Sequence, residues 1–206
     1  MYLGGICFIT DRMLSNLSVE DSVKKVLDAG VKFIQYREKT LSRRDIYFQA
    51  GILRKRTEEY NATFVVNDHC DIALAVDADG VHLGQDDMPI NNARKIMGGR
   101  IIGISTHSLR QAVEAGKAGA DYIGFGPVYH TDMKDAGNPK GPERIAEISS
   151  SIEIPIVAIG GINLRNMHYC FESGAAAIAV ASSILKSDDV FAAAKDICDM
   201  ARRLTF

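Results

Sequence analysis

The sequence has few cysteines, no long apolar run and no excess of charge of either sign. Its four cysteines, Cys7, Cys70, Cys170 and Cys198, are scattered and form no CxxC pair. This spacing argues against a disulfide framework and against a zinc site. No apolar run approaches the ~20 residues of a membrane span. Residues 1–5 lack the basic start and apolar core of a signal peptide. We therefore expect a cytoplasmic protein with reduced thiols.

The composition also limits the partners. With 24 Lys and Arg against 26 Asp and Glu, the net charge of −2 gives no reason to expect nucleic acid or a membrane. Small-molecule substrates remain, and nothing in the sequence opposes a homo-oligomer. The chain of 206 residues is 47% hydrophobic and contains no low-complexity segment or linker. One domain covering residues 1–206 is therefore predicted.

Two neighbouring apolar runs end in acidic clusters. Residues 63–66 read as a buried strand that ends in Asn67 and Asp68, and residues 80–83 as a second that ends near Asp86 and Asp87. A short helix between them makes a βαβ unit, whose strands run the same way, so both clusters reach the same rim. Carboxylates at one rim repel each other unless a cation lies between them, and oxygen ligands favour Mg²⁺.

The rest of the chain repeats the alternation of strand and helix. Strands are expected at 6–10, 33–36, 63–66, 80–83, 101–104, 122–125, 155–159 and 177–180. Helices are expected at 18–30, 42–59, 71–76, 89–97, 108–119, 145–150, 164–172 and 190–204. Eight uninterrupted units predict a (β/α)8 TIM barrel, because an open doubly wound sheet needs only five or six units and no GxGxxG follows the first strand. The long polar connection 126–141 is typical of a lid or binding loop.

The barrel mouth would gather two anion sites. Gln35, Arg37 and Lys39 alternate, which puts them on one face, and two cations beside an amide suit a diphosphate. Salt bridges around the mouth are the alternative. The last two strands end in glycine and small residues, which suit a phosphate bound by backbone N–H groups. Plain turns are the alternative there.

Six motifs in order resemble the thiamine-phosphate synthase and TenI family. They are QYREK at 35–39, VNDH at 66–69, GVHLGQDDMP at 80–89, GISTH at 103–107, DYIGFGPVY at 121–129 and PIVAIGGI at 155–162. The resemblance covers nearly the whole chain. It implies a transferase of thiamine biosynthesis that joins hydroxymethylpyrimidine diphosphate to a (carboxy)thiazole phosphate and releases pyrophosphate with Mg²⁺. No protein nucleophile is required, because the pyrimidine methylene can ionise first.

The resemblance also implies roles for single residues. Gln35, Arg37 and Lys39 would hold the diphosphate beside Asn67, and Asp68 and Asp87 would bind Mg²⁺. Ser105 and Lys134 would line the pyrimidine diphosphate site, and Lys39, Asn67, Ser105 and Lys134 are the expected catalytic residues. Thr131, Gly161, Ala181 and Ser182 would bind the thiazole phosphate. The family loop ThrXaaThrLys is Thr131-Asp132-Met133-Lys134 here, so a thioether replaces one hydroxyl.

Two other functions stay open at this point. A TenI-like thiazole tautomerase would use His107 as acid and base, but Asp68 and Asp87 would have no task in a metal-free isomerase. A noncatalytic phosphate-binding or regulatory barrel is the third reading. Among the other histidines, His82 falls within a strand and reads as a packed barrel residue.

Overall fold

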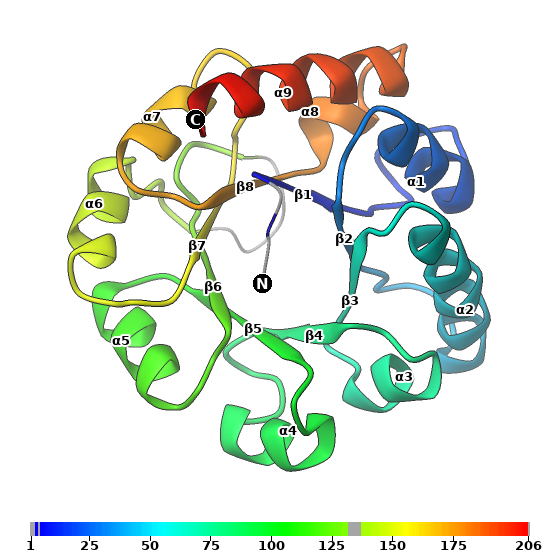
Figure 1. Cartoon of the computed structure of the whole chain (residues 1–206), viewed down its shortest axis with the longest axis horizontal. Helices are drawn as coiled ribbons and strands as arrows, with labels where there is room; N and C mark the ends of the chain where they lie inside the picture. The colour runs from blue at the N-terminus through cyan, green and yellow to red at the C-terminus, as the bar shows by residue number, and fades with distance from the viewer. Residues whose placement is uncertain (1–2, 4, 132–136, 206) are drawn as a thin grey trace.

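The computed structural model describes residues 3, 5–131 and 137–205. The strands within these ranges are parallel and close into a barrel in chain order, with β8 pairing back onto β1. Helices surround the ring of strands (Figure 1), which confirms the predicted (β/α)8 TIM barrel. The strands are β1 (Ile6–Ile9), β2 (Phe33–Tyr36), β3 (Thr63–Asn67), β4 (Gly80–Leu83), β5 (Ile101–Thr106), β6 (Tyr122–Phe125), β7 (Ile156–Ile159) and β8 (Ala177–Val180).

Each predicted helix is present; the range 190–204 matches, and the other helices begin or end up to a few residues from their predicted ends. The helices are α1 (Val19–Asp28), α2 (Arg43–Glu59), α3 (Cys70–Ala75), α4 (Ile90–Met97), α5 (Leu109–Lys117), α6 (Glu143–Ser149), α7 (Met167–Glu172), α8 (Ser182–Leu185) and α9 (Val190–Leu204). The short helix α8 was not predicted; Ser182, expected in the connection after the strand at 177–180, begins this helix. Helix α7 starts three residues later than predicted, because the Asn166 side chain accepts from the Asn163 N–H and closes a turn first.

Serine side chains begin three of the helices. Ser18, Ser42 and Ser108 each accept a hydrogen bond from the backbone N–H three residues on. These bonds satisfy donors that have no partner inside the helix. Serine caps at Ser18 and Ser108 therefore set the starts of the helices predicted at 18–30 and 108–119.

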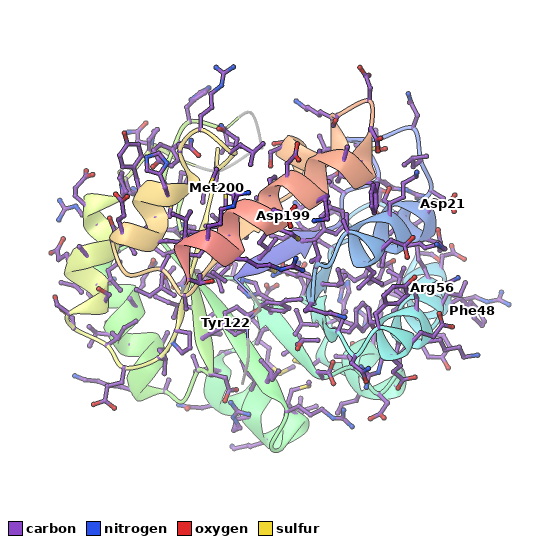
Figure 2. All side chains as sticks on the ribbon, turned by 45° about the horizontal axis from the view of Figure 1, so that its top comes forward. Asp21, Phe48, Arg56, Tyr122, Asp199 and Met200 are labelled. Atoms are coloured by element: carbon purple, nitrogen blue, oxygen red, sulfur yellow. The ribbon has the colours of Figure 1, made fainter. Side chains whose placement is uncertain are left out.

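The core has two apolar layers, one inside the barrel and one between the strands and the helices. Alternate strand residues such as Cys7, Phe33 and Val65 fill the interior together with Leu3, whereas their neighbours pack against the helices. Among the described residues, all four cysteines are buried and unpaired. Helix α2 also carries side chains on its outer surface, among them Phe48, which is 53% exposed (Figure 2).

Aspartates at the amino ends of two strands tie neighbouring units together. Asp79 accepts from the Phe64 N–H and pairs with Arg54, while Asp121 accepts from the Ile102 N–H and pairs with Arg94. Both aspartates directly precede a strand and bond the strand before it. This end of the barrel therefore carries stability, and the opposite end is left for the ligand site.

Candidate active site

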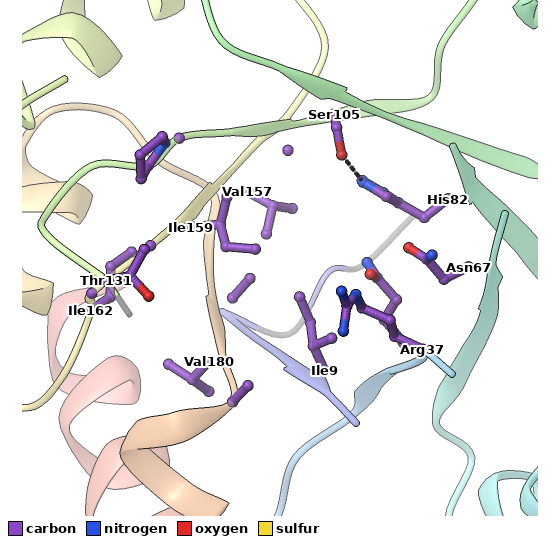
Figure 3. Close-up of a pocket in the computed structure, with 18 of the residues that line it drawn as sticks. Ile9, Arg37, Asn67, His82, Ser105, Thr131, Val157, Ile159, Ile162 and Val180 are labelled. Atoms are coloured by element: carbon purple, nitrogen blue, oxygen red, sulfur yellow. Dashed lines mark hydrogen bonds between the residues drawn. The ribbon is translucent and has the colours of Figure 1, made fainter. Parts of the chain in front are cut away.

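A cavity of about 200 Å³ opens at the carboxyl ends of the strands. Figure 3 shows polar side chains on one side, from Arg37, Asn67, His82 and Ser105, and apolar ones on the other, from Val157, Ile159, Ile162 and Val180. The polar side comes from β2 to β5 and the apolar side mainly from β7 and β8. One cavity thus offers two different chemical surfaces.

Most of the site residues predicted from the sequence meet at this cavity. Those that line it are Gln35, Arg37, Asn67, Ser105, Thr131, Gly161, Ala181 and Ser182. Lys39, Asp68 and Asp87 are not among the described lining residues. They form a cluster beside Asn67 instead. Lys134 lies outside the described residues, as do Asp132 and Met133 of the same loop.

Lys39 and Asp68 form the centre of that cluster. The Lys39 Nζ lies 2.5 Å from Asp68 Oδ2, and the Asn67 amide donates to Asp68 Oδ1 at 2.5 Å. Asp68 has a φ of 65°, which few residues other than glycine adopt. The chain therefore holds this carboxylate in a strained conformation between a cation and an amide. Such strain is common at functional sites.

Asp87 completes the cluster from the loop after β4. Its Oδ2 accepts from the Gly84 N–H at 2.6 Å. Burial raises the pKa of Asp87, and the nearby Asp68 carboxylate raises it further despite the Gly84 hydrogen bond. Two close carboxylates with one lysine bonded to Asp68 form a site with more negative than positive charge. Within the described residues, no group of three or more His, Cys, Asp or Glu side chains could hold a metal ion. The pair of Asp68 and Asp87 would thus bind a metal ion only together with further ligands.

A buried carboxylate shapes the turn between Arg37 and Lys39. Oε1 of Glu38 accepts from the backbone N–H groups of Lys39 at 2.9 Å and Thr40 at 2.7 Å. Burial alone would raise the pKa of Glu38, but the bonds from Thr40 and the charge of Arg12 bring it below its usual value. Because β2 ends at Tyr36, this turn and not the strand pleat directs Lys39 toward Asp68. Both rim cations are in ion pairs, since Arg37 Nη1 lies 3.3 Å from Asp11 Oδ2.

His82 and Tyr122 connect the polar wall to the barrel interior. His82 Nδ1 lies 2.8 Å from the Tyr122 hydroxyl and Nε2 lies 2.8 Å from Ser105 Oγ. Burial lowers the pKa of His82 to about 4, so the ring is neutral near pH 7 and accepts one of these bonds while donating the other. His82 is buried as predicted, but it also lines the cavity with Tyr122. The sequence signal that could have placed His82 at the cavity was its inward-facing position on a strand.

Glycines with little space around their Cα atoms form the cavity wall near β7. A Cβ on Gly161, whose φ is 65°, would lie 2.3 Å from the His130 carbonyl oxygen. The Asn166 amide donates to the Gly161 carbonyl at 3.0 Å and fixes this turn. Asn166 is a site residue that was not predicted from the sequence. Because glycine has no Cβ, it allows the backbone at Gly161 to lie this close to the His130 carbonyl.

His107 lies on the β5 side of the cavity. Its Nδ1–H donates to the Gly126 carbonyl oxygen at 2.7 Å, which fixes the ring between two loops. The other ring nitrogen, Nε2, would have to perform any proton transfer.

No helix within the described ranges is long and apolar enough to cross a bilayer.

Comparison with known proteins agrees with the geometry. The sequence profile of the family described as "Thiamine monophosphate synthase" matches residues 6–184. Thiamine-phosphate synthase of Clostridium novyi (strain NT) is 46% identical over 195 residues, 93% of this chain and 96% of the relative. The corresponding protein of Methanosarcina mazei is 43% identical over 198 residues, 95% of this chain and 82% of the relative.

Solved structures give the same answer. Thiamine phosphate pyrophosphorylase from Pyrococcus furiosus superposes with a TM-score of 0.91 at 42% sequence identity, covering 97% of this chain and 96% of that one. An identity of 42% over nearly the whole of both chains shows a shared family and not only a shared fold. The chain therefore belongs to the thiamine monophosphate synthase family.

Proposed function

We propose that the barrel mouth joins hydroxymethylpyrimidine diphosphate to a thiazole phosphate, yielding thiamine phosphate and pyrophosphate with the help of Mg²⁺. Family membership supports the overall reaction, and with it a transferase of thiamine biosynthesis acting on small molecules. The observation that carries the assignment of the site is the cluster of Lys39, Asp68 and Asp87 beside the cavity residue Asn67. Arg37 lines the same cavity.

Asp68 and Asp87 fit a magnesium ion. Both supply carboxylate oxygens, and the raised pKa of Asp87 reflects burial and a neighbouring negative charge that a divalent cation would offset. Mg²⁺ is commonly held by one or two carboxylates plus waters and substrate phosphates, so a pair of protein ligands suffices. When bound there, the ion would neutralise charge on the departing pyrophosphate.

Arg37 and Lys39 would hold the diphosphate. The Arg37 fork can engage two phosphate oxygens and Lys39 adds a point charge, with the Gln35 and Asn67 amides beside them. As the C–O bond to the pyrimidine methylene breaks, its electron pair leaves with pyrophosphate, and these cations stabilise the added charge. The thiazole nitrogen then supplies the electron pair of the new C–N bond. No side chain of the protein needs to act as nucleophile.

The remaining predicted residues would place the two substrates. Ser105, held by His82 at 2.8 Å, offers a fixed hydroxyl to the pyrimidine side, and Lys134 would join it from the β6–α6 connection. Thr131, Gly161, Ala181 and Ser182 would receive the thiazole phosphate, with the apolar wall beneath it. Holding both reactants in line supplies much of the rate enhancement. One domain comprising residues 1–206, a cytoplasmic location and a homo-oligomer all stay predictions.

Pyrophosphate release, measured with each substrate and Mg²⁺ omitted in turn, tests this function. Arg37→Ala should raise the KM for the pyrimidine diphosphate and lower kcat, because Arg37 lines the cavity. Arg43→Ala is the matched control, since Arg43 is also a rim arginine paired with an aspartate, Asp71, but is 60% exposed and not among the described lining residues. If Arg37→Ala changed only the KM of the thiazole phosphate, the diphosphate assignment would be wrong. A chain that aromatised the thiazole but released no pyrophosphate would be a tautomerase.

A further inference from the structure

Three consecutive residues after β1 contact the segment that carries the proposed diphosphate ligand. Thr10 bonds the backbone of Arg37, Asp11 bonds its guanidinium, and Arg12 approaches Glu38. None of the three is among the described residues that line the cavity. We call Thr10, Asp11 and Arg12 the β1 clamp.

Thr10 extends the pairing of β1 and β2 by means of its side chain. The Thr10 N–H donates to the Gln35 carbonyl at 3.0 Å, which is the last backbone bond between these segments. The Thr10 hydroxyl then accepts from the Arg37 N–H at 2.9 Å and donates to the Arg37 carbonyl at 3.0 Å. Thr10 is 1% exposed, so water does not compete for these bonds. One hydroxyl therefore fixes the backbone of Arg37 on both sides of its Cα.

Asp11 and Arg12 act on the next groups along. Asp11 Oδ1 accepts from the Met13 N–H at 3.0 Å, which orients the carboxylate while its other oxygen faces Arg37 Nη1 at 3.3 Å. Arg12 Nε lies 3.5 Å from Oε2 of Glu38, whose side chain is 2% exposed. Glu38 in turn holds the Lys39 N–H at 2.9 Å. Both proposed diphosphate cations are thus connected to the β1 clamp.

We infer that Thr10, Asp11 and Arg12 are positioning residues for the diphosphate site, which hold Arg37 in the direction that the leaving pyrophosphate requires. The inference rests on the proposed function, since it assumes that Arg37 binds the diphosphate. Long charged side chains lose rotamer freedom when they bind, and a preformed arginine avoids much of that cost. If the β1 clamp served general stability alone, the same contacts would be present, but their effect on pyrophosphate binding would not depend on Arg37.

A double-mutant cycle separates these two roles. The probe is inorganic pyrophosphate with Mg²⁺, whose binding is measured by calorimetry for wild type, T10V, R37A and T10V/R37A. Thr10→Val keeps the shape of the side chain and removes both hydroxyl bonds, so pyrophosphate binding should weaken about tenfold. In the R37A background the same change should alter binding by no more than about twofold. Thr10→Ser retains the hydroxyl and should restore binding.

The possible failures differ from one another. If R37A itself binds pyrophosphate as tightly as wild type, the diphosphate assignment of the proposed function fails. If R37A weakens binding but T10V does not, or T10V weakens it equally in both backgrounds, the clamp is overturned.

A second variant, at the partly buried Asp11, keeps the test valid if T10V does not fold. Asp11→Asn removes a negative charge next to the diphosphate site, which by itself would strengthen pyrophosphate binding. The clamp predicts instead that binding weakens about threefold, because Arg37 loses its charged partner. Tighter binding by D11N would overturn the inference.

Discussion

Acidification should destabilise this protein through His82, because the barrel interior holds this side chain in its neutral form. His82 is 6% exposed, and burial lowers its pKa from the ordinary 6.5 to about 4. Between these two pH values the unfolded chain takes up a proton at this residue and the folded chain does not. The unfolded state therefore gains stability as the pH falls, and folding stability is lost through this window.

The size of the effect follows from the two pKa values. Each pKa unit corresponds to about 1.4 kcal/mol, so the interval from 6.5 to about 4 amounts to about 3 kcal/mol. The contribution is fully present above pH 6.5. This is a large part of the free energy of unfolding of a typical domain, which is roughly 5–15 kcal/mol.

Urea unfolding followed by circular dichroism at a series of pH values from 7 to about 4, in metal-free buffer, measures this loss. Carboxylates also titrate in this range, so the comparison is with His82→Gln, which keeps hydrogen-bonding capacity toward Tyr122 and Ser105 but does not titrate. The free energy of unfolding of wild type should fall more steeply than that of the variant, by about 3 kcal/mol in total. Parallel curves would refute the argument that the interior keeps His82 neutral.

Three further predictions address the metal pair, the interior packing and the opposite end of the barrel. Asp68→Asn or Asp87→Asn should lower Mg²⁺-dependent pyrophosphate release on the order of 100-fold with the fold intact; unchanged turnover in both would remove the metal assignment. Gly103→Ala should cost about 3 kcal/mol in a denaturation experiment, because its Cβ would lie 2.1 Å from Tyr122 Cζ, and an unaffected melting temperature would contradict this packing. Asp121→Asn should cost about 1 kcal/mol without changing either KM, since it weakens the Asp121 bonds to Ile102 and Arg94 far from the mouth; a changed KM would show that the two ends are coupled.

The barrel could be predicted from the sequence because each strand is a short apolar run that ends at a recognisable stop signal. The β2, β4, β6 and β8 bounds match the predicted ranges, since each run is bordered by glycine, charged or small residues. Helix ends were less predictable. The start of α7 depends on the Asn166 turn, and α8 is only one turn long, too short for a periodic pattern to appear.

The site was predictable only as far as strand ends reveal it. Parallel strands bring their carboxyl ends together, so Arg37, Asn67 and Ser105 could be grouped from their positions alone. The β1 clamp could not be foreseen, because the contact between Thr10 and Arg37 joins residues 27 apart and depends on strand register. Likewise, the neutral state of His82 follows from its burial, which no short motif reports.

The most direct test of the central claim is a crystal structure of the protein soaked with Mg²⁺ and pyrophosphate. We expect the ion between the carboxylates of Asp68 and Asp87, with the pyrophosphate against Arg37 and Lys39 at the polar edge of the cavity. Ion and pyrophosphate bound together at any other place, with these four side chains uninvolved, would contradict it.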